Sequence, residues 1–178
     1  LQDEFNVFAN NCDYVECAEF QRNMDNNFDV LHINARSLNK TFDEIIFLLS
    51  CLKHDFSVIG ISETWFKPST DLNLFQIAGY SLFHVCRPDK LGGGVALYIK
   101  SELDSKFRVD LSGPKPGYES IFVEISNNHK KAIVGCLYRA PNADSVSFLE
   151  NFELQLQVLN NENKDVYVMG DFNLNLLN

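Results

Sequence analysis

Residues 165–173 read Asp-Val-Tyr-Val-Met-Gly-Asp-Phe-Asn, an apolar run that ends in a polar cluster. The run up to Met169 predicts a strand, and Gly170-Asp171-Phe172-Asn173 marks the point where the chain leaves the sheet. Strand ends in layered α/β folds are where side chains leave the core and converge on a ligand. Asp-Phe-Asn in this position is also typical of a simple Asx-turn. The motif therefore gains meaning only from partners elsewhere in the chain.

Three further polar clusters directly follow apolar strands. They are Asn34-Ala35-Arg36-Ser37, Ser62-Glu63-Thr64-Trp65 and Tyr138-Arg139-Ala140-Pro141-Asn142. Each has a plain structural alternative. The first can cap the next helix, Glu63 can be a surface or helix-entry carboxylate, and the third can be a loop into a helix.

The chemistry of the four clusters is complementary. Glu63 and Asp171 are hard oxygen ligands that suit Mg²⁺. Asn34 and Asn173 can orient a water or a phosphate oxygen without adding charge. Tyr138 offers a phenolic donor, and Arg139 offers a planar fork that suits phosphate.

The rest of the chain alternates between strand and helix patterns. Strands are expected near Val30–Asn34, Ser57–Ile61, Tyr80–Cys86, Gly94–Ile99, Ser105–Val109, Glu119–Ile125 and Ala132–Tyr138. Turn signals separate them, including a hairpin bend at Gly92-Gly93-Gly94 and a turn at Gly113-Pro114-Lys115-Pro116-Gly117.

Two helices are expected, each with an apolar face at helical spacing. Capping boxes at Thr41-x-x-Glu44 and Ser147-x-x-Glu150 predict where they begin. The first face comprises Phe42, Ile45, Ile46, Leu49 and Leu52. The second helix covers about Ser145–Leu159, with Phe148, Leu149, Phe152, Leu156 and Leu159 on its apolar face.

The chain has 178 residues, enough for one domain, and a net charge of −9. We expect residues 1–27 to be an acidic, polar leader, poorly ordered or with a short helix over Tyr14–Met24, and residues 28–178 to form the domain. Acidic charge weakens a nucleic-acid hypothesis. It is concentrated near the start, however, where residues 1–29 carry seven acidic side chains against Arg22 alone.

The five cysteines are scattered, without zinc-ligand spacing. They favour reduced thiols in an intracellular protein, nuclear or cytoplasmic, over a disulfide framework. The first residues lack the pattern of a signal peptide, and no apolar run has membrane-spanning length.

The order and spacing of the motifs resemble the endonuclease/exonuclease/phosphatase superfamily, most closely the apurinic-type endonuclease domains of non-LTR (LINE-type) retrotransposons. The matching segments, over about residues 29–174, are Leu31–Leu38, Ile61–Trp65, Gly92–Ala96, Tyr118–Ser120, Tyr138–Asn142 and Met169–Asn173. The resemblance implies an α/β fold, a four-layer sandwich of two packed mixed sheets flanked by helices.

The resemblance also implies a magnesium-dependent enzyme, with Mn²⁺ as an alternative ion, that nicks target DNA. Glu63 would be the principal metal ligand, supported by Asn34. Tyr138 would contact the scissile phosphate, with Arg139 and Asn142 close by. Asp171 would orient or deprotonate the attacking water, and Asn173 would steady the phosphate. The expected partners are DNA and a reverse transcriptase domain in a longer polyprotein, with no membrane, and the domain is expected to be a monomer.

The resemblance further implies a segment with another Asp and a terminal Ser-Asp-His, which this sequence does not contain. We therefore interpret the domain as incomplete at its C-terminus and expect little or no turnover. Two alternatives stay open: a non-catalytic remnant of a retroelement, and a phosphatase or lipid phosphodiesterase of the same fold.

Overall fold

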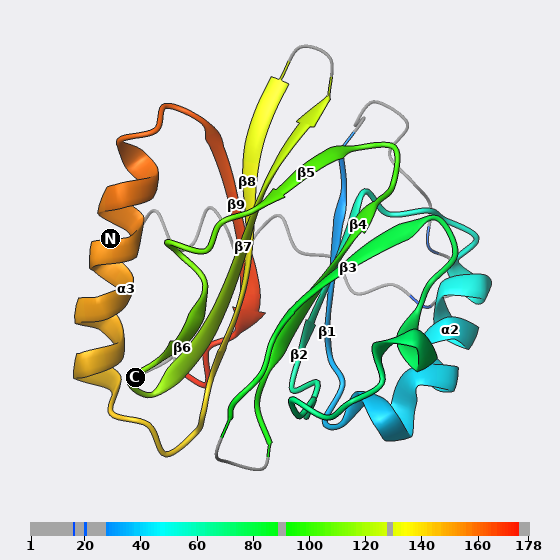
Figure 1. Cartoon of the computed structure of the whole chain (residues 1–178), viewed down its shortest axis with the longest axis horizontal. Coiled ribbons are helices and arrows are strands. Elements are labelled where there is room, and N and C mark those ends of the chain that lie inside the picture. Colours follow the sequence, from blue (N-terminus) through cyan, green and yellow to red (C-terminus); the bar gives the residue numbers. More distant parts are fainter. Residues whose placement is uncertain (1–15, 17–19, 21–27, 89–91, 128–129, 175–178) are drawn as a thin grey trace.

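A computed structural model describes residues 16, 20, 28–88, 92–127 and 130–174 of the chain. Two β-sheets pack face to face, with one helix outside each of them (Figure 1). This arrangement confirms the four-layer α/β sandwich. Most of the expected leader, including most of Tyr14–Met24, lies outside the described residues. Phe20 is described, and its ring centroid lies 6.0 Å from those of His54 and Phe56.

The first sheet has the strand order β1-β2-β4-β3. Its strands are β1 (Val30–Asn34), β2 (Val58–Ser62), β3 (Tyr80–Val85) and β4 (Val95–Lys100). Strands β1 and β2 are parallel, and α2 (Leu38–Leu52) connects them. A short 3-10 helix, η2 (Leu72–Phe75), precedes β3. Every residue of β2 is buried, as its continuous apolar run predicts.

The second sheet has the strand order β5-β7-β8-β9, with β6 paired to β7. Its strands are β5 (Asp104–Phe107), β6 (Gly113–Lys115), β7 (Tyr118–Asn127), β8 (Lys130–Arg139) and β9 (Asp165–Asp171). Strands β8 and β9 are parallel, and α3 (Ser145–Asn160) connects them. Each parallel pair thus forms a strand–helix–strand unit. In each unit the end of the second strand lies beside the end of the first strand.

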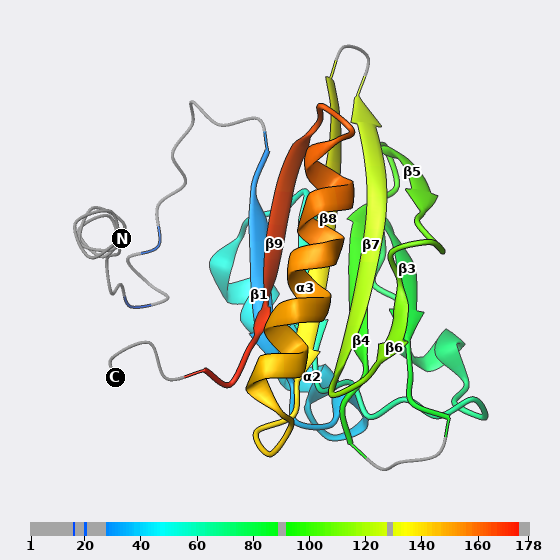
Figure 2. The same cartoon turned by 90° about the vertical axis from the view of Figure 1, so that its left-hand side faces the viewer.

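The main core lies between the two sheets and is formed by aliphatic side chains of β2, β4, β7 and β8. Gly60 on β2 brings the sheets close together, because a Cβ built there would lie 2.4 Å from the Sδ atom of Met169 on β9. Strands β1 and β9 are edge strands of their sheets and lie side by side (Figure 2). Because these two edge strands lie side by side, the ends of β1 and β9 come close together although they are distant in the sequence.

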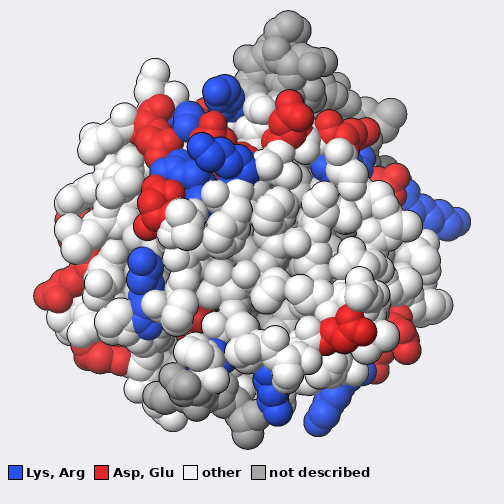
Figure 3. Space-filling view, viewed as in Figure 1, with Lys and Arg blue, Asp and Glu red and all other residues white. Residues whose placement is uncertain are grey.

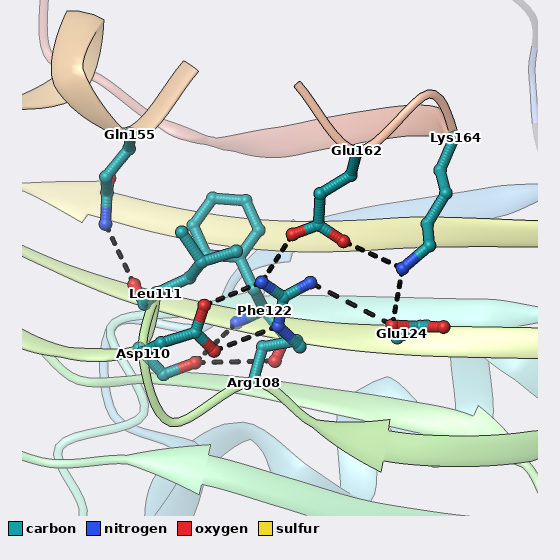
Figure 4. Close-up of polar contacts among 9 residues, drawn as sticks. Arg108, Asp110, Leu111, Phe122, Glu124, Gln155, Glu162 and Lys164 are labelled. Carbon is teal, nitrogen blue, oxygen red and sulfur yellow. Dashed lines mark hydrogen bonds and ion pairs between the residues drawn. The ribbon is translucent and has the colours of Figure 1, made fainter. Parts of the chain in front are cut away.

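An ion-pair network holds the end of α3 to the second sheet (Figure 4). Arg108 pairs with Asp110 and Glu162, and Lys164 contacts both Glu162 and Glu124 at 2.7 and 2.8 Å. These contacts lower the pKa of all three carboxyl groups below their usual range, mainly through the hydrogen bonds from Arg108 and Lys164.

The helix starts differ from the predicted capping boxes. Helix α2 begins after Ser37, three residues before Thr41, whose hydroxyl instead donates to the Ala35 carbonyl at 3.1 Å. The prediction was wrong because the N–H groups of Ser37 and Leu38 bond to the carbonyls of Glu63 and Thr64, at 2.9 and 3.0 Å. A neighbouring loop therefore supplies acceptors that a capping side chain would otherwise provide.

Helix α3 begins after Asp144, whose carboxylate accepts from the N–H of Ser147 at 2.8 Å. Ser147 therefore lies inside the helix and is not its cap. Three apolar positions expected to face the core are exposed: Ile46, Leu149 and Leu156. Gln155 is buried in α3 instead, because it bonds to Tyr118, Ser120 and the Leu111 carbonyl.

The predicted strands are confirmed within a few residues. The sequence did not predict β6, which lies within the expected turn at Gly113–Gly117. Pro114 is tolerated there because β6 pairs with β7 alone and needs no donor on its other side.

Candidate active site

Four strand ends form one polar site. The parallel register places Asn34 opposite Ser62 in the first sheet, and Tyr138 opposite Asp171 in the second. Because β1 and β9 lie side by side, the ends of both parallel pairs meet at the same edge of the sandwich. The site is therefore built across the boundary between the two sheets.

The Asn34 amide joins the two carboxylates of the site. Its Nδ2 donates to Oε1 of Glu63 at 2.9 Å and to Oδ2 of Asp171 at 2.7 Å. Its Oδ1 accepts from the backbone N–H of Arg36 at 3.1 Å, which fixes the orientation of the amide. The bond from Asn34 to Asp171 thus joins residues that are 137 positions apart in the sequence.

Glu63 lies in a loop held by backbone hydrogen bonds. The N–H groups of Thr64 and Trp65 donate to the carbonyls of Gly94 and Gly93, at 3.2 and 2.9 Å. The glycine segment was expected to be only a hairpin bend between strands, and it does join β3 to β4. Its carbonyls also anchor the Glu63 loop, a role that the sequence pattern did not indicate.

Backbone strain is concentrated around the site. Seven non-glycine residues of the described chain have a positive φ angle, and five of them follow β1, β2 or β9. They are Arg36, Ser37, Glu63, Trp65 and Asn173. A non-glycine residue with a positive φ angle costs conformational energy, and such residues cluster at functional sites. The strain supports the view that these loops are shaped for a purpose beyond connecting elements.

Asp171 and Asn173 form the Asx-turn that the sequence left open as an alternative. The N–H of Asn173 donates to Oδ1 of Asp171 at 3.1 Å, while Oδ2 of Asp171 accepts from Asn34. The Asn173 side chain donates to the Arg139 carbonyl at 2.7 Å. The two readings are compatible, because the turn fixes one carboxylate oxygen and leaves the other directed at the site.

Tyr138 lies at the floor of the site and is only 5% exposed. Burial raises the pKa of its phenol, and the nearby carboxylates of Glu63 and Asp171 raise it further, so the hydroxyl keeps its proton at neutral pH. The Arg87 guanidinium lies over the Tyr138 ring, 5.8 Å from its centroid. A protonated phenol at this position can donate a hydrogen bond to a phosphate oxygen.

The structure does not place Arg139 for the phosphate contact that the sequence suggested. Arg139 is 5% exposed, and its guanidinium donates to the carbonyls of Phe172, Asn173 and Ala143. It is also 5.9 Å from the Phe148 ring centroid. Its side chain connects the loop after β9 to the loop before α3. Asn142, in contrast, is exposed and lines a cavity beside the site.

The donor set suits a hard divalent cation. Glu63 and Asp171 are both partly exposed carboxylates within hydrogen-bonding distance of the same amide nitrogen. The described residues contain no group of three or more His, Cys, Asp and Glu side chains that could enclose a metal. Two carboxylates in an open site fit Mg²⁺, which keeps several waters and uses substrate oxygens to complete its shell.

Sequence reasoning assigned no role to Trp65 or Ser62, although both belong to a cluster that it identified. Trp65 donates from its indole to Oε2 of Glu63 at 3.2 Å. His32 and Ser62 lie 3.1 Å apart behind Asn34, and burial lowers the pKa of the His32 imidazole. Trp65 follows Glu63 by two residues, and this spacing was the feature of the sequence that could have predicted the hydrogen bond between them.

A family model described as the endonuclease/exonuclease/phosphatase family matches residues 7–177. The chain belongs to this family. Members of the family are phosphodiesterases and nucleases that generally use divalent metals. No curated protein sequence matches the chain.

Several solved structures share the fold. The endonuclease domain of TRAS1, a telomere-specific non-LTR retrotransposon, aligns with a TM-score of 0.63 and 16% identity over 84% of this chain. The 3′ phosphatase NExo from Neisseria, bound to a product DNA hairpin, has a TM-score of 0.57, 16% identity and 83% coverage. D. rerio TDP2 with a single-strand DNA product has a TM-score of 0.58, 16% identity and 83% coverage.

The alignments cover 62%, 58% and 61% of those three structures, respectively. The chain thus spans about three fifths of their length. At 16% identity, the similarity to these structures establishes that the chain shares their fold.

Proposed function

We propose that this chain is a magnesium-dependent DNA endonuclease domain that nicks target DNA for retrotransposition. The observation that carries the proposal is the Asn34 amide, which holds the carboxylates of Glu63 and Asp171 together across two sheets. An amide that bridges two carboxylates in an open, strained site is difficult to explain by fold stability alone. In the proposal the ion is Mg²⁺ or Mn²⁺.

The residues have separate roles in the proposed reaction. Glu63 would hold the ion, which supplies charge neutralisation on the phosphate. Asp171 orients a water for in-line attack and accepts its proton. Asn34 donates a hydrogen bond to each carboxylate, so that the two lie close together while each keeps its own role. Tyr138 donates from its protonated phenol to a phosphate oxygen, and Asn173 steadies the Asp171 loop.

One face of the molecule carries a mixture of charges. On the face in Figure 3, acidic and basic side chains are mixed around the edge, and the middle carries few of either. This face has no broad basic patch of the kind that drives non-specific DNA binding. Within the described residues no helix is long and apolar enough to cross a membrane. The proposed partners are DNA and a reverse transcriptase domain, with the protein acting inside the cell as a monomer.

The test is nicking of supercoiled plasmid with the protein in molar excess and Mg²⁺ present, so that slow turnover is detected. We expect nicks that require Mg²⁺ and that Glu63→Gln and Asp171→Asn abolish. Asp165→Asn, at the opposite and exposed end of β9, is the matched control and should nick like the parent. Nicking that persists without Mg²⁺ or in Glu63→Gln, or release of phosphate from phosphoinositides in place of nicking, would refute the DNA endonuclease proposal.

A further inference from the structure

A cavity of about 510 Å³ lies next to the site. It is enclosed by the segment after β3, the β6–β7 turn and the loop between β8 and α3. Three donor-bearing side chains, Arg87, Lys115 and Asn142, contribute to its wall. The roles proposed for Glu63, Tyr138 and Asp171 do not use this cavity.

The Arg87 side chain is fixed in place by a buried carboxylate. Its Nε donates to Oε1 of Glu119, which is 2% exposed and whose Oε2 accepts from the N–H of Gly94 at 3.2 Å. Within the described part of the chain, the bond to Glu119 uses only Nε of the guanidinium. Its guanidinium carbon lies 5.8 Å from the centroid of the Tyr138 ring, and Arg87 is one of the residues that line the cavity.

The charge of the cavity favours an anion. Among the described residues that line the cavity, Glu119 is the only acidic one, and its ion pair with Arg87 offsets its charge. Lys115 at the end of β6 is partly exposed and has no ion-pair partner among the described residues, so it leaves a net positive charge. Asn142 adds an exposed amide that can donate a hydrogen bond.

We propose that this cavity binds a second phosphate of the same DNA strand, next to the phosphate at Tyr138. Arg87 is the link, because its guanidinium lies over the Tyr138 ring, 5.8 Å from the centroid, and the same residue lines the cavity. The inference rests on the proposed function and adds a subsite to it.

The test is fluorescence anisotropy of a labelled single-stranded oligonucleotide, without metal, as a function of salt. We expect Lys115→Met to weaken binding about three- to tenfold, and to reduce the slope of log affinity against log salt by about 0.7, the value for one contact to single-stranded DNA. Lys131→Met is the matched control, because Lys131 is exposed near the opposite end of β8 and should bind like the parent.

Arg87→Lys is the second variant, since it keeps the charge but loses the fork, and it should weaken binding with less change in salt slope. Urea midpoints equal to that of the parent would show that both variants fold. A salt slope for Lys115→Met equal to that of the parent would overturn the subsite even if the plasmid is nicked. Displacement of the oligonucleotide by inositol hexakisphosphate at a lower concentration than by unlabelled DNA would also overturn it, in favour of a lipid headgroup. Loss of plasmid nicking alone would instead count against the proposed function.

Discussion

The indole Nε1 of Trp65 donates a hydrogen bond to Oε2 of Glu63 across 3.2 Å. Trp65 is the only tryptophan in the chain and is 38% exposed. Its fluorescence therefore reports on the surroundings of one carboxylate of the candidate site. This relationship provides a test of cation binding that does not depend on turnover.

We expect Mg²⁺ to change the Trp65 emission in a saturable way, because an ion at Glu63 competes with the indole for the carboxylate. Glu63→Gln should remove this response, since a neutral amide is a poor ligand for a hard cation. The measurement is a fluorescence titration, with Asp165→Asn as a control of equal charge change. If Glu63→Gln responds as the parent does, Glu63 does not bind the ion.

Arg139→Lys should lower the free energy of unfolding by about 2–4 kcal/mol, because a single ammonium cannot reach the carbonyls that the guanidinium joins. Those acceptors belong to Phe172, Asn173 and Ala143. Urea denaturation measures the change. Arg36→Lys, at an exposed position, should leave the midpoint within error of the parent. Equal midpoints for both variants would show that Arg139 does not support the loop after β9.

Gly170→Ala should cost about 2–3 kcal/mol of stability, because overpacking and an unfavourable φ act together. The φ angle at Gly170 is +151°, and an added Cβ would lie 2.1 Å from the Leu137 carbonyl oxygen. Gly79→Ala separates the two effects. Gly79 also has a positive φ, +83°, but its Cβ would meet no atom within 4 Å, so we expect only about 1–2 kcal/mol. A smaller loss at Gly170 than at Gly79 would contradict the contact with Leu137.

The fold was largely predictable because each element carries its own periodicity. Strand β2 is continuously apolar, and the two helices repeat apolar residues at helical spacing. Features that depend on a distant segment were not predictable. Helix α2 begins early because the Glu63 loop accepts from Ser37 and Leu38, and that loop is adjacent only in the folded chain.

The site was predictable in part for the same reason. Asn34, Glu63, Tyr138 and Asp171 all lie at or next to the ends of strands, and parallel pairing brings strand ends together. Arg139 follows Tyr138 directly and looked equivalent to it in sequence. The alternation of side chains along β8 places the two on opposite faces of the sheet, so Arg139 packs on Phe148 under α3.

The ion pairs of Asp110, Glu124 and Glu162 should make the protein sensitive to acid. Their pKa values are lowered in the folded state, so their contribution to stability is present above the unfolded pKa of about 4 and is lost as pH falls through the folded values. Glu162→Gln should therefore flatten the fall in stability from about pH 5 downward. Urea midpoints measured across that range test this, with Glu150→Gln on the exposed face of α3 as the control. An unchanged pH profile for Glu162→Gln would exclude the ion-pair network as the source of the sensitivity to acid.

The Asn34 bridge joins two sheets that are separate hydrogen-bonded units. Glu63 follows a strand of the same sheet as Asn34, but Asp171 is in place only while the sheets are docked, so a ligand that binds both carboxylates binds the docked state alone. Such a ligand stabilises the whole sandwich by mass action. Ligand binding and docking of the two sheets are then coupled: the ligand favours the docked sheets, and the docked sheets favour binding of the ligand.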